Sequence, residues 1–334
     1  MKAIALISGG LDSLLAARLI QEQGVGVVPL HFKIPFCQRD KGNLAAGDGA
    51  ISRQVAGLKS ELKTADISGE FLSLITNPRH GFGSNMNPCI DCKVLMLSKA
   101  RELLPQFGAS FVVTGEVLGQ RPMSQHRNAL ELIEKESGLG GLLLRPLSAR
   151  LLAETIPEEQ GWVSRDKLLA LNGRTRRPQI GLARAFNIRD YPNASGGCLL
   201  TDPEFSRRLA ELIAQRELNM RNLELLKFGR HFRLAPQAKL IVGRDEGENN
   251  AILAMARDGD YLFMPPDAIA GPTSLGTGIF NEELIGLACS ITCRYCDLNG
   301  KAAAEILYRK IPAAENKSFP ALAFDKDRLA DYRI

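Results

Sequence analysis

Two groups of residues in this chain of 334 have types and spacings that suit chemistry. The first is Ser8-Gly9-Gly10-Leu11-Asp12-Ser13, which follows an apolar run at residues 4–7 and precedes a helical pattern over residues 14–23. Glycines permit tight backbone turns, and the amide groups at a helix start favour an anion. The pattern predicts a phosphate-binding loop; an ordinary strand–turn–helix with Asp12 as an early helix acid is the alternative.

The second group consists of three cysteines that lie far apart in the sequence. Cys89 and Cys92 form a Cys-x-x-Cys pair at the start of an expected helix, and Cys198 follows two glycines on an expected turn. A helix start lowers the pKa of a thiol, which favours the thiolate that binds a metal or attacks as a nucleophile. These cysteines therefore indicate metal or sulfur chemistry.

The remaining cysteines carry less information. Cys289, Cys293 and Cys296 have the spacing that radical enzymes using S-adenosylmethionine employ, but positions i, i+4 and i+7 also share one face of a helix. Because cysteine is a common small buried residue, we expect a core position here, with a second metal site as the alternative. We assign no role to Cys37.

Composition places the chain among soluble globular proteins. Hydrophobic residues make up 45% and charged residues 24%, and the net charge is +5. No apolar run approaches the roughly 20 residues that span a bilayer, and the N-terminus has no signal-peptide pattern, so we expect a cytoplasmic protein without a membrane partner. Arg174, Arg176 and Arg177 form a local basic cluster, interpreted either as solvated surface or as a contact to RNA phosphates.

Apolar runs alternate with helical patterns in the first part of the chain, which predicts an α/β fold with a parallel twisted sheet and helices on both faces. Strands are expected at residues 4–7, 25–32, 111–114 and 142–144, a helix at 93–104 and a mobile polar loop at 36–49. A smaller C-terminal α+β domain is expected to follow. The predicted boundaries are a catalytic domain at 1–202, a bridging helical segment at 203–227, the C-terminal domain at 228–312 and a loosely ordered tail at 313–334.

Several of these motifs resemble known families. Ser8–Ser13 resembles the pyrophosphate-binding loop (PP-loop) of the N-type ATP pyrophosphatases. Residues 114–120, Thr-Gly-Glu-Val-Leu-Gly-Gln, resemble a segment of the tRNA 4-thiouridine synthase catalytic domain, and the surroundings of Cys89, Cys92, Cys198 and Arg145 resemble segments of that domain or of its stand-alone bacterial relatives. Residues 229–234 and 239–245 resemble the NFACT-R type of RNA-binding domain.

The resemblance implies an adenine nucleotide alpha hydrolase-like fold and a tRNA thiolase that adenylates a uracil oxygen with ATP and Mg²⁺, releases pyrophosphate and then transfers sulfur. The catalytic residues would be Asp12 and Cys198. The nucleotide would be held by residues of the opening loop and two nearby strand ends: Ser8, Gly9, Gly10, Leu11, Asp12, Ser13, His31, Gly115 and Gln120. Glu116 and Gln120 are expected at the carboxyl end of a strand, where ligands bind; helix capping is the alternative role for both residues.

For the sulfur site the resemblance implies that Cys89, Cys92 and Cys198 ligate a [4Fe–4S] cluster; a persulfide on Cys198 and a structural or zinc site are the alternatives. The implied partners are tRNA, contacted by Arg174, Arg176 and Arg177, and a sulfur donor, either free sulfide or a cysteine desulfurase. The sequence leaves open whether the chain forms a homodimer. Two other functions stay open: sulfur insertion into a small metabolite or free nucleotide, and a non-catalytic RNA-binding role.

Overall fold

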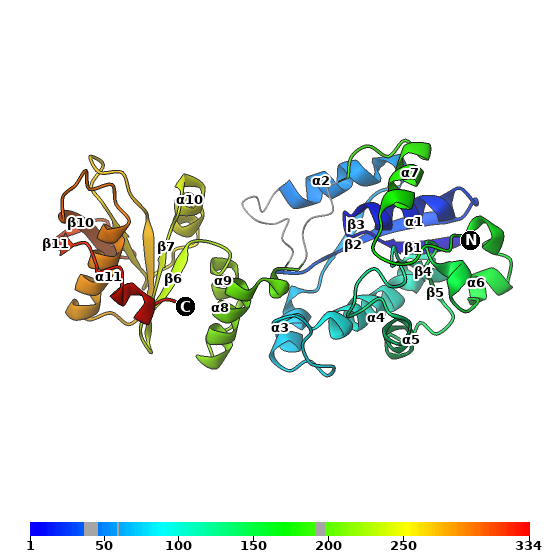
Figure 1. The fold of residues 1–334 in the computed structure, drawn as a ribbon, viewed down its shortest axis with the longest axis horizontal. Coiled ribbons are helices and arrows are strands. Elements are labelled where there is room, and N and C mark those ends of the chain that lie inside the picture. Colours follow the sequence, from blue (N-terminus) through cyan, green and yellow to red (C-terminus); the bar gives the residue numbers. More distant parts are fainter. Residues whose placement is uncertain (37–45, 59, 192–197) are drawn as a thin grey trace. The chain divides into compact units, whose positions relative to one another are not determined.

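The computed structural model describes residues 1–36, 46–58, 60–191 and 198–334. The chain divides into two compact units, Met1–Thr201 and Asp202–Ile334, each with its own sheet (Figure 1). Within the described residues, no helix combines the length and the apolar character needed to cross a membrane.

A parallel sheet of five strands forms the centre of the first unit, in the order β3-β2-β1-β4-β5. Its register sets Ile4 beside Val28 on one side and beside Val112 on the other. The predicted parallel α/β sheet is confirmed, and β3 is a strand that the sequence analysis did not predict. The strands are β1 (Lys2–Leu6), β2 (Gly26–Lys33), β3 (Lys63–Asp66), β4 (Phe111–Val113) and β5 (Leu143–Leu144).

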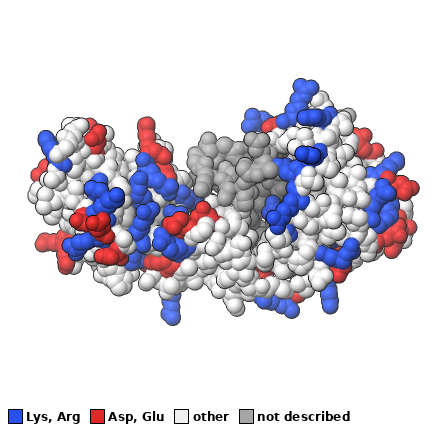
Figure 2. Space-filling view, in the orientation of Figure 1, with Lys and Arg blue, Asp and Glu red and all other residues white. Residues whose placement is uncertain are grey.

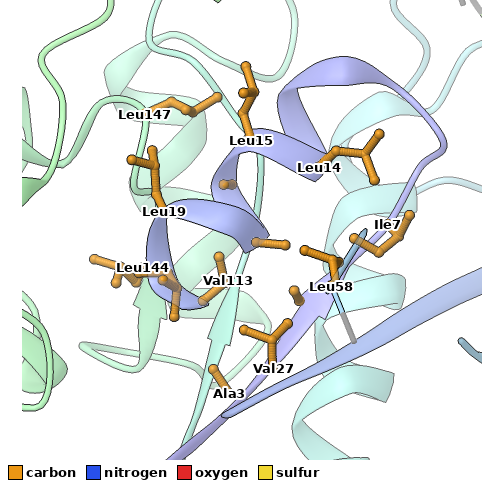
Figure 3. Packing of buried hydrophobic residues seen from close by; sticks show 14 of the residues in the cluster. Ala3, Ile7, Leu14, Leu15, Leu19, Val27, Leu58, Val113, Leu144 and Leu147 are labelled. Carbon is orange, nitrogen blue, oxygen red and sulfur yellow. The ribbon is translucent and has the colours of Figure 1, made fainter. Parts of the chain in front are cut away.

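Helices cover both faces of this sheet because its strands are apolar on both sides. Ala3 and Ala5 belong to one buried cluster with α1 (Leu11–Gln21) and α7 (Arg177–Ala185), whereas Ile4 belongs to another with α4 (Cys89–Phe107) and α5 (Arg127–Glu136). Alternate residues of a strand point to opposite faces, so one short strand supports both layers. Leucines of α1 pack onto the sheet beside Val27 and Val113 (Figure 3). The other helical segments of this unit are α2 (Ala46–Val55), η2 (Ala56–Leu58), α3 (Ser68–Thr76), η3 (Ala149–Leu151), α6 (Ile156–Glu159), η4 (Arg165–Lys167) and η5 (Leu199–Thr201).

The strand order reverses between β1 and β4. The chain proceeds from β1 to β2 and β3 on one side, then returns to place β4 on the other side of β1. In open α/β sheets, ligands bind outside the carboxyl ends of the strands at such a switch point. The loop Ser8–Ser13 follows β1 and residues 114–120 follow β4, so the topology brings these two predicted segments to one edge.

The second unit is built on an antiparallel sheet of six strands in the order β11-β10-β8-β9-β7-β6. Leu240 and Val242 face the cluster formed with α11, whereas Ile241 faces α10 on the opposite side. The strands are β6 (Arg230–Ala235), β7 (Ala238–Val242), β8 (Tyr261–Met264), β9 (Ser274–Gly278), β10 (Ala303–Lys310) and β11 (Lys317–Leu322). The helical segments are α8 (Pro203–Ala214), α9 (Met220–Leu225), α10 (Glu246–Ala254), α11 (Glu282–Arg294) and η6 (Arg328–Asp331).

Three expectations about local structure are corrected. The tail at 313–334 is not loosely ordered: β11 pairs with β10, and the amide of Ile334 donates to the carbonyl of His231. The helical segment at 203–227 is two helices within the second unit, because Arg216 has a φ of 57° and the side chain of Asn219 caps a new helix start. Of the expected mobile loop at 36–49, residues 37–45, including Cys37, lie outside the described part, and residues 46–49 are helical.

The core interpretation of the C-terminal cysteines is supported. Cys289 and Cys293 on α11 are fully buried in the cluster between this helix and the sheet, and Cys296 packs against that cluster. The Cys293 thiol donates to the carbonyl of Ala321 on β11 (3.3 Å), and the Cys296 thiol to that of Thr292 (3.4 Å). Their spacing therefore follows from one buried helix face.

Candidate nucleotide and sulfur site

The loop after β1 leaves the start of α1 open to an anion. Gly9 has a φ of 70°, a left-handed conformation that favours glycine. Gly10 is the N-cap residue of α1 and has no side chain to satisfy the first helical amides. Ser13 Oγ donates to the Gly10 carbonyl (2.8 Å) and accepts from the Ser8 amide (3.2 Å). These serine contacts hold the loop in shape, and the amide groups at a helix start favour an anion.

The segment after β4 packs directly against this helix start. A methyl group at Gly115 would lie 2.4 Å from the carbonyl carbon of Asp12 and 2.4 Å from the amide nitrogen of Ser13. Only glycine allows so close an approach of two backbones. Gln120 also joins this segment to the helix start, since its Nε2 donates a hydrogen bond to Asp12 Oδ2 over 3.0 Å. Gly115 and Gln120 therefore lie at the loop with which the resemblance associated them.

Asp12 is the acidic group of this loop. Burial raises the pKa of Asp12, while the hydrogen bond from Gln120 and the charges of Arg176 and Arg121 oppose that rise. Its second oxygen, Oδ1, is buried and has no hydrogen-bond partner among the described residues. A carboxylate oxygen without a protein donor is suited to a hard cation such as Mg²⁺.

Glu116 does not cap a helix; it lies at the centre of a buried charge network. Its carboxylate is 3.1 Å from Arg145 Nε and 3.4 Å from Lys93 Nζ, and it accepts a hydrogen bond from Thr114 (3.1 Å). Burial by itself would raise the pKa of Glu116, but the charges of Lys93 and Arg145 outweigh it and hold the pKa below its usual value. Because Lys93 belongs to α4, Glu116 ties the segment after β4 to the helix that carries two of the cysteines.

Cys89 and Cys92 occupy the first turn of α4. Cys89 is its first residue, and the Cys92 amide donates to the carbonyl of Pro88 (2.9 Å). The Cys89 thiol donates to the hydroxyl oxygen of Ser124 (3.1 Å), a fully buried residue of the segment that follows Gln120.

Hydrogen bonds to two other segments hold the stretch of chain that begins at Cys198. The amide of Leu199 donates to the carbonyl of Phe36, just after β2 (3.0 Å). Asn85, in the loop before Cys89, donates from Nδ2 to the carbonyl of Thr201 (2.9 Å), and the Thr201 amide donates to the carbonyl of Cys198 (2.9 Å). The motif residues Gly196 and Gly197 lie outside the described part of the chain.

Electrostatic interactions link the thiol of Cys92 to those of Cys89 and Cys198. Burial raises the pKa of Cys92 to about 12; the charge of Lys93 opposes this, the charges of Cys198 and Cys89 add to it, and that of Arg121 opposes it. The expectation that the helix start lowers the thiol pKa is therefore wrong for Cys92, because burial dominates. Arg121 acts on both Cys92 and Asp12, so one cation lies within electrostatic range of the opening loop and of the thiols.

The thiols form a soft donor set of the kind that iron–sulfur clusters use. Within the described residues, no three His, Cys, Asp or Glu side chains converge on one point as the ligands of a single ion would. The ligands of a cluster bind separate iron atoms, so they need not converge on one point.

The remaining predicted residues have different surroundings. His31 Nδ1 lies 2.8 Å from the carbonyl oxygen of Ile7, so it donates to the last residue before the loop. Arg174 and Arg177 are exposed, whereas Arg176 is half-buried and acts on Asp12. Arg176 therefore belongs to the basic cluster and also lies near the loop that contains Asp12.

The sequence analysis missed Arg121, Ser124, Lys93 and Asn85. Arg121 directly follows the predicted Gln120, and Lys93 directly follows Cys92, so adjacency was the only signal for either residue. Asn85 has a φ of 54°, a conformation in which asparagine is enriched, but its contact to Thr201 spans 116 residues.

Two family models match separate parts of the chain. Residues 1–151 match the model described as thiamine biosynthesis protein (ThiI), and residues 229–333 match the model described as NFACT protein RNA binding domain. The first part of the chain is therefore similar to the ThiI family, and the last part to the NFACT RNA-binding domains. The second match reaches Arg333 and so includes the strand β11 that the predicted boundary at 312 left out.

Several named relatives resemble the first part of the chain. A probable tRNA sulfurtransferase of Thermococcus kodakarensis is 28% identical over 155 residues, which are 44% of this chain and 36% of that protein. A tRNA-specific 2-thiouridylase MnmA of Pelobacter propionicus is 33% identical over 125 residues, 34% of this chain and 33% of that protein. The chain thus spans about a third of the length of these relatives. A crystal structure of a 4-thiouridine synthetase–RNA complex with bound ATP aligns at 25% identity and a TM-score of 0.33, over 40% of this chain and 34% of that one.

Proposed function

We propose that this protein is an ATP-dependent tRNA uridine thiolase. The observation that carries the proposal is that a helix start suited to an anion and the thiol of Cys92, on which Cys89 and Cys198 also act, both lie within electrostatic range of Arg121. Enzymes that activate an oxygen with ATP and replace it by sulfur need these two sites side by side. Relatives named tRNA sulfurtransferase and tRNA 2-thiouridylase, and an NFACT-family domain, support tRNA as the substrate.

In the proposed first step, the triphosphate of ATP lies on the amide groups at the start of α1. A carbonyl oxygen of uracil attacks the α-phosphorus; a new O–P bond forms, and the bond between the α- and β-phosphates breaks with release of pyrophosphate. Asp12 would orient Mg²⁺ through its unpartnered oxygen, and Arg121 and Arg176 would neutralise phosphate charge. Positioning and charge neutralisation account for the catalysis of this step.

In the proposed second step, a sulfur nucleophile attacks the activated carbon. A C–S bond forms, the C–O bond breaks, and AMP leaves with the electron pair. Cys89, Cys92 and Cys198 would hold a [4Fe–4S] cluster, which when bound supplies an iron atom that carries sulfide. The alternative is a persulfide on Cys198, whose outer sulfur attacks the activated carbon. The thiol of Cys89 or Cys92 then breaks the S–S bond, which leaves the thiolated base and a disulfide with Cys198 that an external thiol reduces. In both cases the sulfur is delivered at the carboxyl edge of the sheet, where the base is activated.

The test is anaerobic purification, iron and sulfide analysis, and incubation with unmodified tRNA, ATP, Mg²⁺ and sulfide. We expect AMP, pyrophosphate and a thiolated uridine detected by nucleoside mass spectrometry. Asp12→Asn should lower AMP formation about 100-fold, the scale of removing one electrostatic interaction with the transition state. Cys198→Ser should abolish thiolation and preserve ATP binding, and Cys296→Ser, a matched cysteine change in the other unit, should preserve both.

The iron content separates the two sulfur sources. Loss of iron in Cys198→Ser but not in Cys296→Ser supports the cluster. A wild-type protein that contains no iron and is active only when a cysteine desulfurase and cysteine replace sulfide supports the persulfide. Thiolation that persists in Cys198→Ser would refute the assigned sulfur site.

The family description, which refers to thiamine biosynthesis, favours a second candidate, namely sulfur insertion into a small metabolite. Formation of AMP that does not depend on added tRNA, together with tRNA that stays unmodified, would support this candidate instead.

A further inference from the structure

A cavity of about 300 Å³ in the second unit is lined by four arginines: Arg208, Arg230, Arg244 and Arg333. They come from α8, from the two ends of the hairpin β6–β7 and from the segment after η6. Lys and Arg side chains gather over the middle of this unit on the face shown in Figure 2, with some Asp and Glu among them. The cavity is separate from the predicted RNA contact at residues 174–177, which belongs to the first unit.

Two of these guanidinium groups converge on a single carbonyl oxygen. Arg244 Nη2 donates to the Gly229 carbonyl over 2.8 Å, and Arg208 Nη1 lies 3.5 Å from the same oxygen. Gly229 has a φ of 71°, and a methyl group there would lie 2.7 Å from the carbonyl oxygen of Val242, so a glycine is required at this turn. One neutral carbonyl is a weak partner for two full positive charges.

The positive charges at the cavity are only partly balanced. Arg244 pairs with Glu248 (3.3 Å), but within the described residues no carboxylate forms an ion pair with Arg208, Arg230 or Arg333. Glu204, the acidic side chain lining the cavity, pairs with Arg207 (2.8 Å).

The base of the cavity adds no compensating negative charge. Burial lowers the pKa of His231 well below its usual value, and the charges of Lys239, Arg208 and Arg244 add to this effect, so the imidazole is neutral. His231 is 1% exposed, and its Nδ1 has no hydrogen-bond partner among the described residues. The pKa of Arg208 is also lowered, first by burial and then by the charge of Arg244, although Asp202 and Glu204 oppose this. This cluster of cations would be stabilised by an added anion.

We propose that this cavity binds a phosphate group of RNA and is the contact through which the second unit holds its RNA. Planar guanidinium groups suit phosphate because they donate two parallel hydrogen bonds to its oxygens. The cavity itself supports the inference that a phosphate group binds there. The assignment of this phosphate to tRNA rests on the proposed function. The bound group is either a terminal phosphate or a backbone phosphodiester.

The test measures RNA binding by the full chain without ATP or a sulfur source, so it is independent of thiolation. Fluorescence anisotropy would compare the wild type with Arg208→Gln/Arg333→Gln for a tRNA transcript at several salt concentrations. We expect binding about tenfold or more weaker, because two charged hydrogen-bond donors are removed. The dependence of log affinity on log salt should become shallower by about one unit for each arginine–phosphate interaction that is removed. Arg294→Gln, an exposed arginine in the last turn of α11 that does not line the cavity, is the matched control and should bind like the wild type.

Two single-stranded RNAs that differ only in carrying a 5′-phosphate or a 5′-hydroxyl distinguish a site for a terminal phosphate from a site for a backbone phosphodiester. A terminal site predicts that the double variant loses affinity only for the 5′-phosphorylated RNA, whereas a backbone site predicts equal losses for both. Equal affinities and salt slopes for the wild type, the double variant and the control would overturn the proposal.

A second measurement on the wild-type protein covers the case in which the double variant does not fold. Arginine-selective chemical modification followed by mass spectrometry should show that RNA protects Arg208, Arg230 and Arg333 but not Arg294. Inorganic phosphate at millimolar concentration should protect the same three arginines more weakly. Equal modification with and without RNA would contradict the proposal. Intact RNA binding with absent thiolation would instead count against the proposed function alone.

Discussion

Replacing Gly115 by alanine tests whether the segment after β4 and the start of α1 form one tightly packed site. The added methyl group would lie 2.4 Å from two main-chain atoms of Asp12 and Ser13, and 2.6 Å from the Asp12 carbonyl oxygen. Main-chain atoms cannot rotate away as the end of a flexible side chain can. The two segments must therefore separate, and the helix amides and the Asp12 carboxylate must shift with them.

The expected magnitude follows from overpacking. Extra atoms in a well-packed site cost about 1–3 kcal/mol. Since each kcal/mol lowers the Tm of a unit of this size by about 2–4 °C, the Tm of the first unit should fall by about 2–12 °C. Weakening one charge-assisted hydrogen bond to the triphosphate should also raise the Kd for ATP about tenfold or more.

Calorimetric unfolding and equilibrium binding of ATP would measure these two effects. The matched control is Gly181→Ala in α7, where a methyl group meets no atom within 4 Å. This change should stabilise the helix by about 0.5–1 kcal/mol and leave ATP binding unchanged. If Gly115→Ala retains both the Tm and the ATP affinity of the wild type, the close backbone contact does not hold the nucleotide site together.

Other predictions concern the charge network and the sulfur site. Glu116→Gln should destabilise the first unit by about 3 kcal/mol in denaturant unfolding, because it leaves buried cations without their carboxylate; an unchanged midpoint would mean that the network adds no net stability. The same carboxylate predicts a pH dependence. Its folded-state pKa lies below the usual 4.5, so its contribution is complete above that pH and is lost as the pH falls through the folded-state pKa. The stability of the wild type should therefore fall more steeply below about pH 4.5 than that of Glu116→Gln, and parallel curves would contradict this. Asn85→Ala removes the hydrogen bond to the Thr201 carbonyl and should lower thiolation several-fold while AMP formation stays at the wild-type rate, as separate assays of AMP and thiouridine would show; equal losses in both would place Asn85 in ATP binding instead.

Patterns that act over a few neighbouring residues could be predicted from the sequence. The strand-loop-helix at residues 4–23 was predicted because glycines and an early helix acid have local conformational and electrostatic meaning. The helix α4 and the strand β4 were also predicted, because their apolar residues recur over a short stretch. The same reasoning failed for β3, where Lys63–Asp66 has little apolar pattern and forms a strand only because it pairs with β2 at the sheet edge.

Long-range contacts could not be predicted in this way. The sequence proposed that Cys198 joins Cys89 and Cys92, but the residues that hold it there, Phe36 and Asn85, show no local signal. The tail was misjudged for the same reason, since β11 is stabilised by its pairing with β10 and not by its own composition.

The residue types and local spacings of this chain were sufficient to predict a phosphate-binding loop, a set of cysteines and several strands and helices, because each prediction depends on residues close together in the sequence. Tertiary structure decided which of these parts meet. The strand order set residues 114–120 against the opening loop, placed Arg121 within reach of both Asp12 and Cys92, and gathered four arginines from distant segments around one cavity. Such encounters depend on the packing of the whole chain, so they could be recognised only once its strands and helices had been placed in space.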